Sequence, residues 1–132
     1  GIKAFSLDEE KTINGINIYG FPWVNYINGM FNYELSTRAM QIKCAELKEK
    51  LESKYIDILV CHGPMTNGLS NEGFADYGNS ILEQYILSLD KNYIPSHMLV
   101  GHCHNAKGIK FRNDLNMIIV NSATTLHSID IK

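Results

Sequence analysis

The sequence predicts an α/β fold in which helices pack against a sheet with parallel central strands. Residues 36–53 and 80–89 have helical periodicity, and the short apolar runs at residues 55–61 and 97–100 are typical of buried strands. Hairpin patterns stand near both ends of the chain. The expected order is hairpin, helix, strand, helix, strand, hairpin, a layered arrangement in which ligands bind beyond the carboxyl ends of the strands.

A β-hairpin is expected to open the chain. Residues 2–7 alternate as in a strand, residues 8–11 are expected to form a charged turn, and the second strand covers residues 16–19. Asn14-Gly15, just before that second strand, is a tight-turn signal. After the hairpin comes the only tryptophan, Trp23, which we expect to pack against the core or a lid rather than to line a cleft.

The first helix is expected to begin at Ser36 or Thr37, either of which can cap it, and to end at Ser53. Glu46 and Lys50 have the spacing of an exposed ion pair on one face. The apolar residues at i, i+4, i+7 and i+11 form one stripe that should be buried; they are Met40, Cys44, Leu47 and Leu51.

The second helix is expected to begin at Ser80, with Glu83 completing a capping box. Before it, residues 64–78 form a long loop rich in Gly, Asn and Ser, a kind of loop that is more often functional than idle. After the second helix and the strand at 97–100, a hairpin is expected over residues 109–120, turning at Asn113-Asp114. The second helix should bury Ile81, Leu82, Tyr85, Ile86 and Leu89.

Length, composition and charge limit the classes of function that the chain can have. The chain has 132 residues, with 45% hydrophobic and 20% charged, which is ordinary for one globular domain or part of one. A net charge of -2 gives no indication of the excess positive charge that binding to nucleic acid or acidic membranes requires. Three cysteines without a C-x-x-C spacing favour a reducing compartment, by default the cytoplasm. No signal peptide is expected, because the sequence opens directly into a strand-like pattern, and the absence of an initiator Met fits a processed or excised chain.

Two predicted strands each deliver histidine where an apolar run stops. The run at 58–61 ends in His62, and the run at 98–100 is followed by Gly101, His102 and His104. Residues i and i+2 of an extended chain share a face, so His102 and His104 can converge. Imidazole is the commonest metal-binding side chain. We therefore predict a metal site formed by His62, His102 and His104.

The remaining candidate ligands are assigned structural roles. His97 and His127 have no partner beside them and are expected to make ordinary structural hydrogen bonds. Cys103 has no second cysteine at ligand spacing and is assigned to packing. The carboxylates Asp57, Asp76 and Asp90 stand at no recognisable spacing from the histidines. Three histidines alone would suit one zinc ion with an open position for hydrolysis.

Taken together, these motifs resemble the calcineurin-like metallophosphoesterases. Residues 57–64 (DILVCHGP) and 100–104 (VGHCH) are similar to the H-G and G-H-x-H elements that close a di-metal centre in that family. Residues 15–23 and 78–85 resemble its small metallophosphoesterase-domain-containing branch, some members of which hydrolyse cyclic nucleotides. Asn121-Ser122 is similar to a strand-end element of the same branch. The resemblance extends over nearly the whole chain.

The resemblance implies a fold and a ligand set. The family fold is a four-layer β-sandwich of two sheets flanked by helices, of which residues 1–132 would be the C-terminal half of a single domain. His62 and His102 would bind the second metal and His104 the first, with Mn, Zn, Fe or Mg as the two divalent metals. The family's D-x-H, G-D-x-x-D and G-N-H-[DE] motifs have no counterpart here, so the resemblance assigns no catalytic residue to this chain.

The activity implied is metal-dependent hydrolysis of a phosphoester, by a phosphodiesterase or phosphatase. A metal-bridging hydroxide attacks phosphorus in such enzymes, and the substrate is a small-molecule phosphoester, with cyclic nucleotides as one class. Activity is expected only with the missing N-terminal half of the domain. The alternative is a truncated, non-catalytic paralogue that acts as a binding module. In neither case is nucleic acid or a membrane the expected partner.

Overall fold

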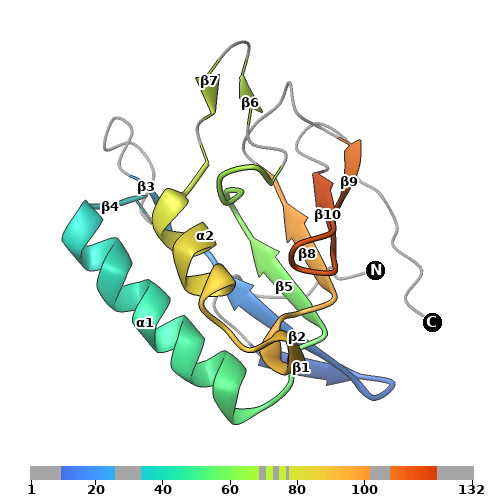
Figure 1. Ribbon diagram of the computed structural model, residues 1–132. Coiled ribbons are helices and arrows are strands. Elements are labelled where there is room, and N and C mark those ends of the chain that lie inside the picture. Colours follow the sequence, from blue (N-terminus) through green and yellow to red (C-terminus); the bar gives the residue numbers. More distant parts are fainter. Residues whose placement is uncertain are drawn as a thin grey trace.

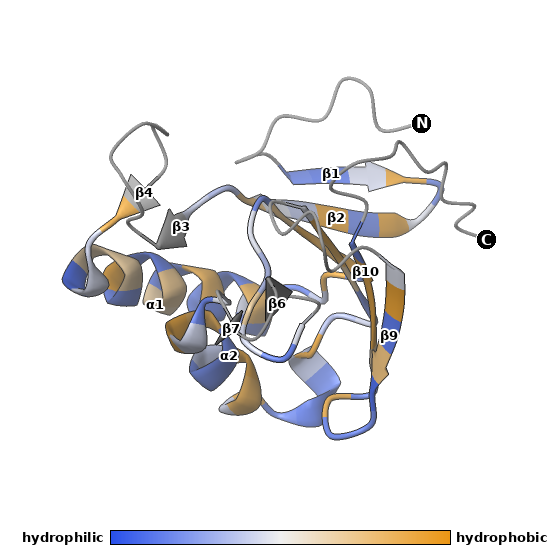
Figure 2. Ribbon diagram, turned by 90° about the horizontal axis from the view of Figure 1, so that it is seen from above, coloured by the Kyte–Doolittle hydropathy of each residue, from blue (hydrophilic) through white to orange (hydrophobic). Residues whose placement is uncertain are grey.

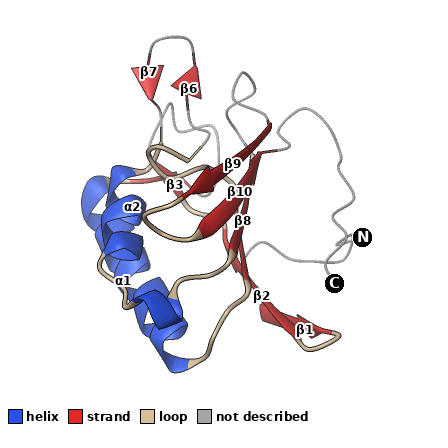
Figure 3. Ribbon diagram, turned by 45° about the vertical axis from the view of Figure 1, so that its right-hand side comes forward, coloured by secondary structure: helices blue, strands red, loops and turns tan. Residues whose placement is uncertain are grey.

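The computed structural model has one mixed six-stranded sheet with both of the described helices on the same face (Figures 1 and 3). It describes residues 10–25, 34–68, 71–72, 75–76, 78–101 and 108–121. The strand order is β1-β2-β5-β8-β10-β9. The strands are β1 (Glu10–Ile13), β2 (Ile16–Phe21), β5 (Ile58–Cys61), β8 (His97–Val100), β9 (Gly108–Arg112) and β10 (Met117–Asn121).

The four central strands of the sheet, β2, β5, β8 and β10, run parallel, and the edge strands β1 and β9 pair antiparallel to their neighbours. The predicted α/β class is therefore confirmed. The helices are α1 (Thr37–Ser53) and α2 (Ser80–Leu87), with a short 3-10 turn, η1 (Lys91–Tyr93). Two small ribbons complete the described elements, β3 (Val24–Asn25) with β4 (Glu34–Leu35), and β6 (Asn71–Glu72) with β7 (Ala75–Asp76).

The opening hairpin is confirmed with β1 at Glu10–Ile13 paired to β2, and the strand predicted at residues 2–7 lies outside the described residues. Glu10 and Lys11, expected in a turn, lie in β1. The turn itself is the predicted one. Asn14 has φ 51° and Gly15 has φ 81°, and positive φ at both positions is what a two-residue hairpin turn requires.

Charged residues can lie in β1 because α1 supplies their counter-charges. The carboxylate of Glu10 contacts the Nζ of Lys50, and the Nζ of Lys54 at 2.8 Å. The predicted pair between Glu46 and Lys50 is therefore wrong. Glu46 instead pairs with Lys43, at 3.4 Å, within the same helix.

The first helix agrees with the sequence prediction. Ser36 is its N-cap, and the side-chain hydroxyl of Ser36 accepts a hydrogen bond from the N–H of Ala39 at 3.3 Å. All four residues of the predicted apolar stripe are buried; they are Met40, Cys44, Leu47 and Leu51.

The second helix begins as predicted at Ser80, but the capping box is wrong. Asn79 is the N-cap, and its side-chain oxygen accepts from the N–H of Leu82 at 3.0 Å. The carboxylate of Glu83 is bonded elsewhere, to Arg112. Leu82 and Ile86 are buried as expected, and Leu89 is buried just beyond the helix.

Apolar residues predominate along the central strands of the sheet (Figure 2), and because side chains alternate along a strand, the register places apolar residues on both faces. The face toward the helices contributes Tyr19, Phe21, Leu59, Cys61, Met98, Val100, Met117 and Ile119 to the core. The second face carries Ile13, Ile16, Ile18, Ile58, Val60, Leu99, Ile109, Phe111, Ile118 and Val120. Central residues of this face, such as Ile18 and Ile58, are each 1% exposed, whereas Ile109 and Phe111 on β9 are 76% and 49% exposed.

Replacing Glu10 by glutamine should lower the free energy of unfolding near pH 7 by roughly 0.5–1 kcal/mol, because two lysines lose their anionic partner. Hydrogen bonds from Lys50 and Lys54 hold the pKa of Glu10 below its ordinary value of 4.5. This stabilisation is therefore present above pH 4.5 and is lost as the pH falls through the lower, folded-state pKa.

Urea unfolding of the wild type and of Glu10→Gln, near pH 7 and again in acid, measures this effect. The difference between the two proteins should shrink in acid. Glu46→Gln is the matched control, because the carboxylate of Glu46 pairs with Lys43 on the same exposed helix surface and makes no ion pair with β1 among the described residues. A difference that is equal at both pH values would contradict the role assigned to the Glu10 carboxylate.

Candidate functional site

The parallel strands β2, β5, β8 and β10 end at one edge of the sheet, and His62 lies there, directly after β5. Register brings Phe21 beside Cys61, and Val100 beside Asn121, at the last rung of the sheet. Ligand sites of parallel sheets form beyond this edge. The predicted location of the site at the carboxyl ends of the strands therefore agrees with the position of His62.

The backbone of His62 is held on both sides. Its N–H donates to the carbonyl oxygen of Phe21 at 3.4 Å, and its carbonyl oxygen accepts from the N–H of Gly101 at 3.0 Å. His62 thus extends the sheet ladder by one residue toward both neighbouring strands. The residue itself is half-buried. Its Cα position is consequently fixed by the sheet and not by a free loop.

Gly101 links the two histidine elements, because it follows β8 and directly precedes His102 in the sequence. A Cβ atom added to Gly101 would meet the carbonyl oxygen of His62 at 3.4 Å, so the two backbones are in close contact. His102, Cys103 and His104 lie outside the described residues. The three-histidine metal site therefore stays a prediction. Within the described part of the chain, no three His, Cys, Asp or Glu side chains gather closely enough to hold a metal ion.

The loop after His62 is tied to the start of α2. The N–H of Asn79 donates to the carbonyl of Pro64 at 2.9 Å, and the carbonyl of Asn79 accepts from the N–H of Thr66 at 3.4 Å. A further turn forms where the N–H of Gly68 donates to the carbonyl of Met65 at 3.0 Å. Residues 62–68, called the His62 loop below, are thus ordered by hydrogen bonds from a separate element.

Sequence reasoning missed a group of charged residues behind the His62 loop. Arg112 of β9 bonds to the carboxylate of Glu83 in α2, and also reaches the carbonyl of Thr66. The spacing of Glu83 predicts a capping box and gives no indication of an ion pair with Arg112, which lies 29 residues further along the chain. Local sequence therefore carries no signal for the pair.

Two other residues that the sequence analysis weighed as ligands, His97 and Asp57, make structural hydrogen bonds. His97 lies at the start of β8, at the opposite end of the sheet from His62, and its Nδ1 is 2.9 Å from the hydroxyl of Ser96. Its predicted structural role is confirmed, with a hydroxyl and not a carbonyl as partner. Asp57 precedes β5 and accepts the N–H of Asn17 at 2.8 Å. His127 lies outside the described residues.

The cysteines of the described residues are packing residues. Cys44 and Cys61 are both free and buried. Burial raises the pKa of the Cys44 thiol to about 12 and raises that of Cys61 as well. Both thiols are therefore protonated at neutral pH, and a protonated thiol is neither a nucleophile nor a metal ligand.

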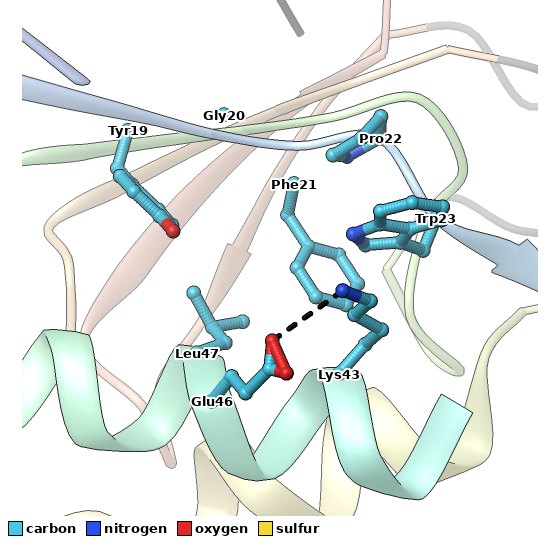
Figure 4. Close-up of a pocket in the computed structure, with 8 residues that line it drawn as sticks. All are labelled: Tyr19, Gly20, Phe21, Pro22, Trp23, Lys43, Glu46 and Leu47. Atoms are coloured by element: carbon cyan, nitrogen blue, oxygen red, sulfur yellow. Dashed lines mark hydrogen bonds and ion pairs between the residues drawn. The ribbon is translucent and has the colours of Figure 1, made fainter. Parts of the chain in front are cut away.

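A cavity of about 160 Å³ lies between β2 and α1 (Figure 4). It is lined by Tyr19, Gly20, Phe21, Pro22, Trp23, Lys43, Glu46 and Leu47. The Nζ of Lys43 lies 4.8 Å from the ring centroid of Trp23, within the range of a cation–π contact. Trp23 packs against the core as expected, but it also forms part of the wall of this cavity, which the sequence prediction disfavoured.

No protein-family model matches the chain, and no curated protein matches it. Functional inference consequently depends on the motifs and on where the fold carries them. Among the described residues, no helix is long and apolar enough to cross a membrane.

Replacing Gly78 by alanine should disturb the His62 loop. A Cβ at Gly78 would lie 2.5 Å from the backbone N and Cα of Thr66, so the loop must move. We expect a loss of about 1–3 kcal/mol in the free energy of unfolding, as for other overpacked sites. Gly101→Ala is the control, because its Cβ would make only an ordinary contact. Equal urea midpoints for Gly78→Ala and wild type would contradict this account of the loop.

Proposed function

We propose that this chain contributes the C-terminal half of a metal-dependent phosphoester hydrolase of the calcineurin-like metallophosphoesterase type. The observation that carries the proposal is the hydrogen bond from the N–H of Gly101 to the carbonyl of His62. This bond joins His62, one predicted ligand, to Gly101, and Gly101 directly precedes His102, another predicted ligand. His104 follows two residues later in the sequence. In the sequence, the three predicted ligands therefore follow the ends of two neighbouring strands, β5 and β8.

The two apolar faces of the sheet support the finer fold assignment. The centre of the second face is already buried at Ile18 and Ile58, whereas apolar residues toward its edges are exposed and would be covered by a further layer. In a four-layer β-sandwich that layer is a second sheet, which the N-terminal half of the domain would supply. Exposed apolar residues on the second face, Ile13, Ile109 and Phe111, fit such a contact.

The donor chemistry fits a pair of divalent cations. His62 offers an imidazole from a backbone position that is hydrogen-bonded on both sides, and a ligand on a rigid element holds its geometry well. The described cysteines are protonated and do not compete as ligands. His62 and His102 would hold one cation and His104 the other. Two such cations supply the positive charge that activates water and neutralises the phosphoryl oxygens of the substrate.

The chain's own residues bind and orient in this proposal, and the proton-transfer groups belong to the N-terminal half. Neutral imidazoles leave the full positive charge of the cations for the substrate. Gly63 is buried beside His62 and has no side chain to fill the site, and Pro64 stiffens the turn that follows. The substrate class is a small phosphodiester or phosphomonoester, cyclic nucleotides included.

Histidine substitutions in the complete protein that contains this chain test the proposal. His62→Ala and His104→Ala should each lower Mn²⁺-dependent hydrolysis of bis(p-nitrophenyl) phosphate by at least about 100-fold, since loss of outer-shell partners alone costs about 10–100-fold. His97→Ala is the matched control, because His97 lies at the opposite end of the sheet. Circular dichroism checks that each variant is folded. Unchanged turnover in His62→Ala would refute the hydrolase assignment.

A non-catalytic binding module is the second candidate. The observation that favours it is the exposure of Ile109 and Phe111 on the second face, which a protein partner could cover. It predicts no stoichiometric transition metal in the purified complete protein by elemental analysis. Stoichiometric metal that is lost in His62→Ala would exclude it.

A further inference from the structure

A buried ion-pair cluster lies behind the His62 loop. The guanidinium of Arg112 is 9% exposed and contacts two carboxylates, that of Glu83 in α2 and that of Asp114 in the β9–β10 turn. Glu83 is 14% exposed, whereas Asp114 is 51% exposed. A charge this well buried is costly unless it is paired, and both carboxylates pair with it: Asp114 accepts from Nε and Nη2, and Glu83 accepts from Nη1, the nitrogen that also reaches the loop.

The cluster also binds the backbone of the His62 loop. Nη1 of Arg112 donates to the carbonyl of Thr66 at 3.4 Å, and Nζ of Lys110 donates to the next carbonyl, that of Asn67, at 2.9 Å. The side-chain amide of Asn67 donates in turn to the Glu83 carboxylate at 3.4 Å. Two side chains of β9 thus hold two successive carbonyl groups of the loop.

The position of β9 in the chain gives these contacts their significance. β9 begins at Gly108, shortly after His104, so the strand that follows the second histidine element binds the loop that follows the first. The hydrogen bond from the N–H of Gly101 to the carbonyl of His62 is a second link, between the residue after β8 and the start of the His62 loop. An apolar residue in place of Arg112 would leave the Thr66 carbonyl without this donor, which packing alone would not replace.

We propose that Arg112, paired with Glu83 and assisted by Lys110, is a positioning residue that fixes the His62 loop, and with it His62, relative to β9 and α2. Its consequence for metal binding rests on the proposed function. Its consequence for the order of the loop does not. The two parts can therefore fail separately.

Amide hydrogen exchange in the complete protein tests the order of the loop. Arg112→Met should speed exchange of the Asn79 and Gly68 amides, whose acceptors are loop carbonyls, by at least tenfold. The amide of Ile118, bonded to Ser96 at the far end of the sheet, should not change. Asp114→Asn is the matched control, because it removes the exposed partner of the same guanidinium and leaves the loop contacts intact. Lys110→Met, which removes a single exposed contact, gives a milder variant if Arg112→Met does not fold.

Mn²⁺ titration of the same proteins tests the second part. Arg112→Met should weaken Mn²⁺ binding about 10–100-fold, as loss of an outer-shell partner does, and Arg112→Lys should recover part of the affinity. Unchanged loop exchange in both Arg112→Met and Lys110→Met would overturn the positioning role. Faster exchange with unaltered Mn²⁺ affinity would overturn its link to the metal while leaving the proposed function standing. Failure of the wild type to bind Mn²⁺ would overturn the proposed function and the metal part together.

Discussion

Parallel pairing of the four central strands is the constraint on which the rest of the structure depends. Because β2, β5, β8 and β10 run in one direction, their carboxyl ends meet at one edge, and segments far apart in the sequence become neighbours there. The backbone of His62 is bonded to Phe21 on one side and to Gly101 on the other as a direct result. The helices do not determine which strand ends are neighbours. They cover one face of the sheet, where the core lies.

Features with a local cause could be predicted from the sequence. The apolar stripe and serine cap define α1, and Asn14-Gly15 defines the first turn, because each depends on residues within a few positions. Features with distant partners could not. Glu10 of β1 pairs with Lys50 of α1 and with Lys54, which follows α1 and is 44 residues away from Glu10. Glu83 bonds to Arg112, 29 residues away, and not to the helix cap.

The candidate site divides in the same way. Apolar runs ending in histidine predict strand ends, and His62 does lie at one. The contact between His62 and Gly101 depends on the neighbouring positions of β5 and β8, which no local pattern specifies. Trp23 illustrates the limit for side chains: packing against the core and lining a cavity are compatible roles, and sequence reasoning treated them as alternatives.

Lys110 has a consequence beyond the loop it holds. It lies in the middle of β9, an edge strand among the described strands, and its neighbours in sequence, Ile109 and Phe111, are exposed on the opposite face. Edge strands with apolar side chains invite pairing with the strands of other molecules, and a lysine in such a strand opposes this because its charge would have to be buried. A lysine at this position therefore disfavours pairing of another strand along β9, in addition to its bond to the loop.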